Sequence, residues 1–172
     1  TGHTGFKGSW LSVWLKMMNA EISGYALEPY TDRDNFVVTD LHDKIGHVIG
    51  DVRDFEKLSG IFSEHNPEFV FHLAAQPLVR ESYLNPKETY DINIGGTVNV
   101  LECCRRTDSV KVIVNITTDK CYENNEQTCG YKEDDRLGGY DPYSSSKACS
   151  EIVTGACRRS FFRPEEFEKH GK

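Results

Sequence analysis

The sequence predicts an α/β protein built on an open, doubly wound parallel sheet with helices on both faces. Three observations lead to this class: β-rich segments alternate with amphipathic helical segments, the segment at 69–75 is a nearly continuous apolar run, and the first eight residues hold three glycines. Alternation implies right-handed crossovers between parallel strands, and a continuous apolar run is typical of a strand covered on both faces. The 172 residues suffice for one domain, which we place over residues 1–172.

The predicted elements follow in a regular order. Apolar residues at helical spacing predict helices over 10–18, 54–66, 87–106 and 142–162, and β-rich segments predict strands over 21–28, 47–52, 69–75 and 110–120. The apolar positions of the first helix run from Trp10 to Met18, and we expect the helix to begin within the opening stretch TGHTGFKGSW. A glycine turn of this kind normally follows a strand, and the tail after the last helix completes no strand. We therefore expect the domain to be truncated at both ends.

Composition excludes several classes of function. The formal net charge of -7 comes without clustered lysines and arginines, so we expect no nucleic-acid partner. No apolar run approaches the roughly 20 residues that span a bilayer, and no signal-peptide pattern opens the chain, so we expect a cytoplasmic protein without a membrane partner. The six cysteines make no CxxC or CxxH spacing. We therefore expect reduced, mostly buried thiols and no metal site.

The opening TGHTGFKG places Gly2, Gly5 and Gly8 three residues apart at the start of a helix. Such a turn lets the backbone approach a phosphate and directs free N–H groups and the positive helix end toward it. The spacing differs from the common GxGxxG pattern, and a flexible terminus is the alternative interpretation.

Further candidate residues follow the predicted strands, at the sheet edge where open α/β proteins bind ligands. Asp51 ends one apolar segment, and Ala74 and Ala75 end another, where small side chains would let a flat cofactor lie close. Glu28, about twenty residues after the last glycine, is a candidate acceptor for an adenosine ribose and would disfavour a 2′-phosphate. Glu28 starting a loop, and the alanines serving as ordinary packing, are the alternatives.

Tyr143 and Lys147 stand four residues apart, so a helix places them on one face. An ammonium beside a phenol, helped by a bound nicotinamide cation, would lower the pKa of Tyr143 toward neutrality. The phenol could then take a hydroxyl proton during hydride transfer. A YxxxK pattern alone also fits a solvated helix face. The glycine turn, Asp51 and the Leu73–Ala75 segment in the expected order favour the functional interpretation.

The motifs TGHTGFKG, GDVRD, HLAAQ, DINIGGT and YSSSK together resemble the extended short-chain dehydrogenase/reductase family. Within it, the sequence is similar to nucleotide-sugar 4,6-dehydratases, and Asp119–Lys120 is similar to the type that acts on CDP-glucose. The resemblance covers essentially the whole chain and implies a Rossmann-like fold and bound NAD. By resemblance, the cofactor-binding residues are Gly2, Thr4, Gly5, Phe6, Gly8, Asp51, Val52, Leu73, Ala74, Ala75, Gln76, Thr117, Tyr143 and Lys147.

The resemblance also implies a reaction, the dehydration of CDP-glucose to CDP-4-keto-6-deoxyglucose in deoxysugar synthesis for surface polysaccharides such as lipopolysaccharide. Tyr143 would be the base at the 4-hydroxyl, Lys147 would tune it, and Thr118 would bind the same oxygen. Asp119 would protonate the departing 6-hydroxyl. Lys120 would help remove the C5 proton, which requires a depressed pKa that burial beside the cationic cofactor could produce.

Three expectations complete the interpretation. Asn93 bridges a helix to a strand end, and Gly95–Gly96 allow close helix packing. In the family that the sequence resembles, the helices at 96–106 and 142–162 form a four-helix interface, which implies a homodimer. The alternatives are another dehydratase or epimerase of the same fold, or a non-catalytic NAD-binding module.

Overall fold

The computed structural model describes residues 1–163, 165 and 167–170. The strands are β1 (Ser23–Ala26), β2 (Gly46–Ile49), β3 (Phe69–His72) and β4 (Val112–Asn115). The helices are α1 (Phe6–Met17), α2 (Asn35–Val38), α3 (Phe55–His65), α4 (Val79–Leu84), α5 (Pro86–Tyr90), α6 (Gly96–Arg106), α7 (Pro142–Phe161) and α8 (Phe167–His170). Three short helical turns complete the set, η1 (Leu41–Asp43), η2 (Asp91–Gly95) and η3 (Asp119–Cys121). The expectation of no further strand in the tail falls partly on residues 164, 166 and 171–172, outside the described residues.

The strands form two parallel pairs, β1 with β2 and β3 with β4. The first residues of the chain lie between the pairs: the Gly2 nitrogen donates to Tyr25 at 3.0 Å, and the Thr1 oxygen accepts from the Leu73 nitrogen at 3.3 Å. Ala26 pairs with Ile49, and His72 pairs with Asn115. The carboxyl ends of all four strands therefore lie along one edge, at which the opening glycine turn also begins.

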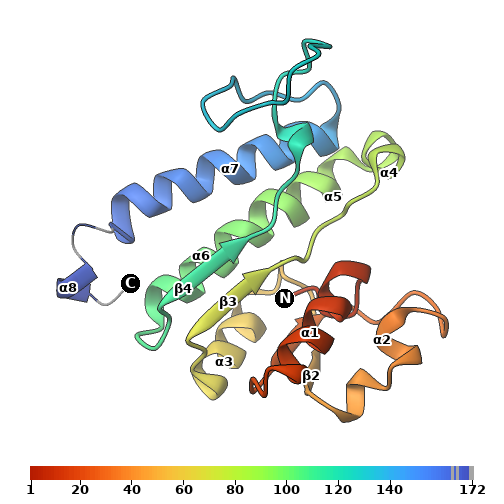
Figure 1. Ribbon diagram of the computed structural model, residues 1–172, viewed down its shortest axis with the longest axis vertical. Helices are drawn as coiled ribbons and strands as arrows, with labels where there is room; N and C mark the ends of the chain where they lie inside the picture. Colours follow the sequence, from red (N-terminus) through yellow and green to blue (C-terminus); the bar gives the residue numbers. More distant parts are fainter. Residues whose placement is uncertain (164, 166, 171–172) are drawn as a thin grey trace.

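Helices lie on both sides of the strands, as predicted (Figure 1). In the view of Figure 1, α1 lies in front of β2, whereas α3 and α6 lie behind β3 and β4. Helix α6 packs against α3 and α7 on that side. The core between these helices and the strands contains Tyr25, Val52, Leu58, Phe62, Val70, Val100, Cys103, Cys104 and Val110.

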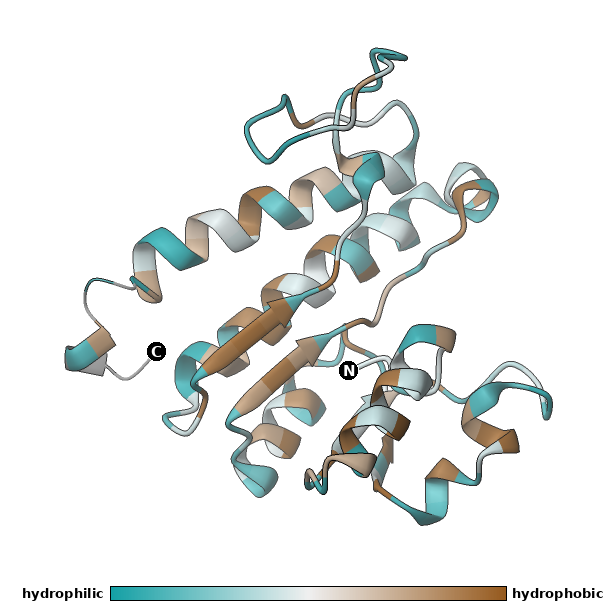
Figure 2. Ribbon diagram, viewed as in Figure 1, coloured by the Kyte–Doolittle hydropathy of each residue, from teal (hydrophilic) through white to brown (hydrophobic). Residues whose placement is uncertain are grey.

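The prediction that 69–75 is a strand covered on both faces is wrong in detail. Val70 and His72 point to the α6 side and are buried, whereas Phe69, on the other face, is 58% exposed. The reason is that the described helices cover β3 and β4 only from behind (Figure 1). Most of the length of β3 and β4 is nevertheless coloured as hydrophobic in Figure 2.

Several element boundaries differ from the prediction. Each strand is shorter than its apolar segment, because pairing stops at the common edge and the chain then turns. The expected helix at 87–106 is one helical run, but Asp91–Gly95 within it is π-helical. Helices α2 and α4 lie in segments for which the sequence predicts neither a helix nor a strand. These short elements are held by tertiary packing rather than by strong helical periodicity.

Helix α1 forms where the apolar spacing predicted it, but that apolar face is largely exposed. Trp10, Trp14 and Met18 retain 55%, 65% and 65% of their accessible surface, while the buried positions are Gly8, Ser9 and Ser12. Small residues are buried here because α1 packs closely over the glycine turn. Within the part of the chain that the structure describes, no helix has the length and apolar character to cross a membrane.

Candidate functional site

The glycine turn at the N-terminus of α1 is closely packed and requires glycine at two positions. Gly2 has a φ of +74°, and a Cβ there would lie 2.6 Å from the Ala74 nitrogen. A Cβ on Gly8 would lie 2.1 Å from the Gly2 oxygen. Gly5 is the N-cap of α1, whose first turn holds no acidic residue. The positive end of the helix is therefore not neutralised by a carboxylate and favours an anion.

The turn is fixed to the end of β1 through a threonine. Thr4, which is buried, donates its hydroxyl to the Leu27 oxygen at 2.9 Å. Phe6 is 77% exposed at the start of α1. Glu28, the candidate ribose acceptor, is exposed one residue after Leu27. Its assignment stays a prediction.

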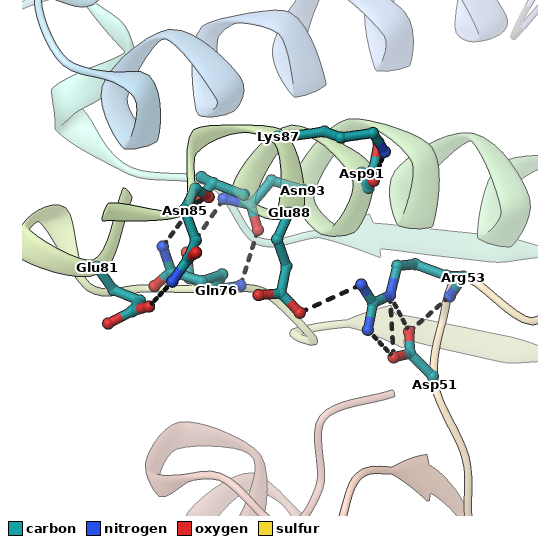
Figure 3. A network of polar contacts seen from close by, with 10 residues as sticks. Asp51, Arg53, Gln76, Glu81, Asn85, Lys87, Glu88, Asp91 and Asn93 are labelled. Carbon is teal, nitrogen blue, oxygen red and sulfur yellow. Dashed lines mark hydrogen bonds and ion pairs between the residues drawn. The ribbon is translucent and has the colours of Figure 1, made fainter. Parts of the chain in front are cut away.

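Beyond β2, Asp51 forms a network that the sequence interpretation missed (Figure 3). The Asp51 carboxylate accepts from the backbone nitrogen of Arg53 at 2.9 Å and from its guanidinium at 2.6 and 3.0 Å. Arg53 also reaches Glu88 on α5 at 3.3 Å. Hydrogen bonds from Arg53 lower the pKa of Asp51, which therefore stays ionised. The GDVRD motif contained the arginine, but only the fold places Glu88 beside it.

Val52, which follows β2, packs against helix α6. Its side chain is buried, and a Cβ on Gly96 would lie 2.7 Å from it. Asn99 of α6 donates to the Val52 oxygen at 2.8 Å. Gly96 thus allows the close helix packing that we expected of Gly95–Gly96, whereas a Cβ on Gly95 would meet nothing within 4 Å.

The segment after β3, Leu73–Gln76, is half-buried along the same edge. Asn93 of η2 accepts from the Gln76 nitrogen at 2.8 Å and donates to the Gln76 oxygen at 3.1 Å. Asn93 also donates to Ser146 of α7 at 2.8 Å. The expected bridge from a helix to a strand end is confirmed. Its connection onward to α7 was not predicted.

Tyr143 and Lys147 lie on one face of α7 and are both buried, with 8% and 6% of their surface exposed. Pro142 starts the helix, and the Asp141 side chain caps it by accepting from the Ser144 nitrogen at 2.9 Å. The Lys147 ammonium donates to the Ile116 oxygen, after β4, at 3.2 Å. Burial, and the nearby charge of Lys7 on α1, lower the pKa of Lys147 to about 8. The pair therefore lies between the end of β4 and the start of α1.

The expectation that a lysine lowers the pKa of Tyr143 is not met by the protein alone. Burial raises the pKa of Tyr143, and a hydrogen bond from Thr118 only partly opposes this effect. The physical reason is desolvation of the phenolate, which outweighs the local partners. Within this chain, the pKa of Tyr143 therefore lies above its ordinary value.

The segment Thr117–Lys120, which we expected at the carboxyl end of a strand over 110–120, instead follows the shorter β4, and η3 packs against α7. Thr117 hydrogen-bonds to Glu151 of α7, and Thr118 caps η3 and contacts Asp119 at 3.1 Å. Asp119 and Lys120 are exposed. Lys120 therefore lacks, within this chain, the burial that we expected around a lysine that accepts a proton.

The structure thus collects the predicted residues along one edge: the glycine turn, the loops after β2 and β3, the segment after β4, and the start of α7. The residues that hold this arrangement, among them Arg53, Glu88, Asn115, Ser146, Ser150 and Glu151, were not identified from sequence. The serines of YSSSKACS were the available signal, because polar residues recur there on the predicted buried face. Among the described residues, no group of histidine, cysteine and carboxylate side chains has a metal-binding arrangement.

The fold and the site match the class that the sequence resembles, Rossmann-like proteins with a Tyr–Lys pair beside a glycine turn. The chain belongs to the family described as GDP-mannose 4,6 dehydratase, whose model matches residues 1–164. It is 54% identical over 171 residues to CDP-glucose 4,6-dehydratase of Salmonella typhimurium, covering 99% of this chain and 48% of that protein. It is 34% identical over 159 residues to UDP-glucose 4-epimerase of Neisseria gonorrhoeae, covering 88% of this chain and 45% of that protein.

Solved structures of related proteins have the same fold as this chain. UDP-glucose 4-epimerase of Thermotoga maritima, determined with UDP-glucose, matches with a TM-score of 0.84 and 26% identity over 94% of this chain and 50% of that one. UDP-glucose 4-epimerase of Thermus thermophilus, determined with NAD, matches with a TM-score of 0.79 and 25% identity, again over 94% and 50%. The chain spans about half the length of the curated relatives it matches.

Proposed function

We propose that this chain is the NAD-binding part of a nucleotide-sugar 4,6-dehydratase that acts on CDP-glucose. The observation that carries the proposal is the burial of Tyr143 and Lys147 on one face of α7, against the segment that contains Thr118 and Asp119. The 54% identity to a CDP-glucose 4,6-dehydratase supports this choice within the family.

The residues present fit a dinucleotide. Gly2 and Gly8 permit a tight turn in which a Cβ would clash with backbone atoms, and this turn leads into a helix end without a carboxylate. Gly2, Thr4, Gly5, Phe6 and Gly8 would hold the diphosphate there. The residues for the rest of the dinucleotide would be Asp51, Val52, Leu73, Ala74, Ala75, Gln76, Thr117, Tyr143 and Lys147. When bound, NAD supplies hydride transfer, first from sugar C4 and later to C6.

The side chains of this chain handle the protons. Tyr143 Oη would take the proton of the 4-hydroxyl, and Thr118 would hydrogen-bond the same oxygen. The Lys147 ammonium, fixed by the Ile116 carbonyl, would stabilise the phenolate electrostatically. Asp119 would protonate the departing 6-hydroxyl. Lys120, which is exposed in this chain, would assist removal of the C5 proton once the bound cofactor covers it. A ketone at C4 acidifies that proton, which makes elimination accessible to ordinary side chains.

The test is incubation of the protein with NAD and, separately, CDP-glucose, dTDP-glucose and UDP-glucose. The expected result is the alkali-induced chromophore of a 4-keto-6-deoxy sugar, formed fastest from CDP-glucose. A 4-epimer without the chromophore would identify an epimerase instead. NAD binding without any sugar product would identify a binding module, and either outcome overturns the proposal.

We further propose a homodimer formed through α6 and α7. Val98 on α6, and Ile152 and Phe161 on α7, retain 44%, 55% and 52% of their surface, so both helices present apolar side chains to solvent. Pairing these helices with those of a second copy would bury that surface. Sedimentation equilibrium should give the mass of a dimer, and a monomer at micromolar concentration would contradict the proposal.

A further inference from the structure

One face of α7 carries both the proposed catalytic pair and an anchor. Tyr143, Lys147, Ser150 and Thr154 follow one another by four, three and four residues, so they line one side of the helix. Tyr143 and Lys147 lie at the N-terminal end of this face. Ser150 and Thr154 accept hydrogen bonds from the two amide hydrogens of Asn115, at 3.1 and 2.8 Å.

Asn115 lies where it can hold the proposed catalytic pair in position. It is the last residue of β4, and the next residue, Ile116, accepts the hydrogen bond of the Lys147 ammonium at 3.2 Å. Two consecutive residues of one strand end thus hold α7 at two points a turn apart. A shift of α7 along β4 would break both contacts together.

In the hydrogen-bond network around Asn115, each hydroxyl has one proton to donate, so the direction of every hydrogen bond is fixed. The Thr97 hydroxyl has a single proton, which it donates to the Asn93 oxygen at 2.7 Å. Thr97 must then accept from the Ser150 hydroxyl at 3.0 Å. Ser150, having donated its own proton, accepts from Asn115. The residue at position 115 must therefore donate a hydrogen bond to Ser150, as the amide of Asn115 does.

His72 is at the other end of this network, and the same limits on donors and acceptors determine which of its nitrogens carries the proton. The His72 Nε2 faces the Thr97 oxygen at 3.3 Å and donates to it, so its Nδ1 accepts from the Thr1 hydroxyl at 2.8 Å. Burial lowers the pKa of His72 to about 3, which keeps the ring neutral, as this pattern requires. Thr97, Ser150 and His72 are all buried, so unsatisfied partners would be costly.

We infer that Asn115 is a positioning residue, which sets the register of α7 against β4 so that Lys147 meets Ile116 and Tyr143 faces Thr118. The inference rests on the proposed function for the roles of Tyr143 and Lys147. Asn115 itself touches neither reacting group. Its contribution is geometric, and displacement of a catalytic group by about 1 Å can reduce turnover on the order of a hundredfold.

The test compares Asn115→Leu, which removes both donors at similar volume, with the matched control Asn35→Leu. Asn35 is also half-buried and donates its amide to a serine, Ser9, at 2.9 Å, but it lies on α2, away from α7. We expect Asn115→Leu to lower kcat by about tenfold to a hundredfold with KM changed by less than about twofold. Asn35→Leu should lower thermal stability without this loss of kcat.

A second measurement separates positioning from mere stabilisation. Titration of isotope-labelled lysines by NMR should show the pKa of Lys147 near 8 in the original protein and higher in folded Asn115→Leu, as the ammonium leaves its buried contact. Unchanged kcat and unchanged Lys147 titration in the folded variant would overturn the inference. If Asn115→Leu does not fold, Ser150→Ala, which removes one acceptor, takes its place with the same criteria.

The two proposals fail differently. If the original protein makes no product, the proposed function fails, while the Lys147 titration still decides whether Asn115 positions α7. If the original protein turns over and Asn115→Leu matches it in kcat and in Lys147 titration, only the positioning role fails.

Discussion

The Lys147 ammonium lies 3.2 Å from the backbone oxygen of Ile116, the residue that follows the last position of β4. This contact joins the helix that holds Tyr143 to the strand end that leads into Thr117–Lys120. It also keeps a positive charge in a buried place, where the burial lowers the pKa of Lys147 to about 8. The buried Lys147 therefore has a role in the proposed reaction, and its burial lowers the free energy of unfolding at neutral pH.

Replacing Tyr143 by phenylalanine should abolish most of the proposed reaction. The variant removes the group that takes the 4-hydroxyl proton, and such a loss costs about 10²–10⁴-fold in turnover. NAD affinity, measured by fluorescence titration, should stay within a few-fold. Tyr140→Phe is the control, because Tyr140 is 98% exposed three residues away. Equal turnover in Tyr143→Phe and the original protein would refute the assignment.

Replacing Lys147 by methionine should stabilise the folded protein at neutral pH. The pKa of Lys147 is about 8 when folded and about 10.5 when unfolded, so burying the ammonium costs about 3 kcal/mol below pH 8. Between pH 8 and 10.5 the unfolded state binds more protons, and the free energy of unfolding of the original protein rises relative to the variant. Urea unfolding at pH 7 and pH 10 measures this difference, and a pH-independent difference would contradict it.

Acid should destabilise the protein through His3. Burial, and to a lesser extent His47, lower the pKa of His3 to about 3, from an ordinary value near 6.5. The unfolded state therefore binds the proton first, and the stability present above pH 6.5 is lost progressively as the pH falls toward 3. From pH 6.5 to 5, the loss is about 1.5 kcal/mol for this one group.

The measurement is urea unfolding of the original protein and His3→Gln at pH 6.5 and pH 5. The variant should lose less free energy of unfolding over this interval, by about that amount. His65→Gln is a control on α3, away from the glycine turn. Parallel losses in all three proteins would show that His3 does not titrate as described.

The glycine turn should not tolerate a side chain at Gly8. A Cβ there would meet the Gly2 oxygen at 2.1 Å, so Gly8→Ala must displace the turn that would hold the diphosphate. We expect at least about a tenfold loss of NAD affinity by calorimetry. Gly60→Ala is the matched control, because its Cβ would meet nothing within 4 Å on α3, and it should raise the free energy of unfolding by about 1 kcal/mol. Equal NAD affinity in both variants would show that the glycine turn does not contribute to NAD binding.

The comparison of α1 with α7 shows what periodicity predicts well and what it does not. In both, apolar or small residues at helical spacing located the helix correctly. In α1, however, Trp10 and Trp14 are exposed and Ser9 and Ser12 are buried. Spacing predicts that a face exists, but the close approach of the glycine turn decides which face is covered. The alternation of elements predicted the parallel pairing because crossover connections permit few other arrangements.

The sequence alone predicts the order of the elements, a glycine turn at the start of the first helix, and the placing of Tyr143 and Lys147 on one helix face. These properties are local, since they depend on backbone conformation and on helical spacing. Tertiary packing brings Arg53 to Glu88, anchors Asn115 to Ser150 and Thr154, and leaves Lys120 exposed. These hydrogen bonds join residues 35 to 39 positions apart, and burial and charge act through space, so no local pattern specifies them.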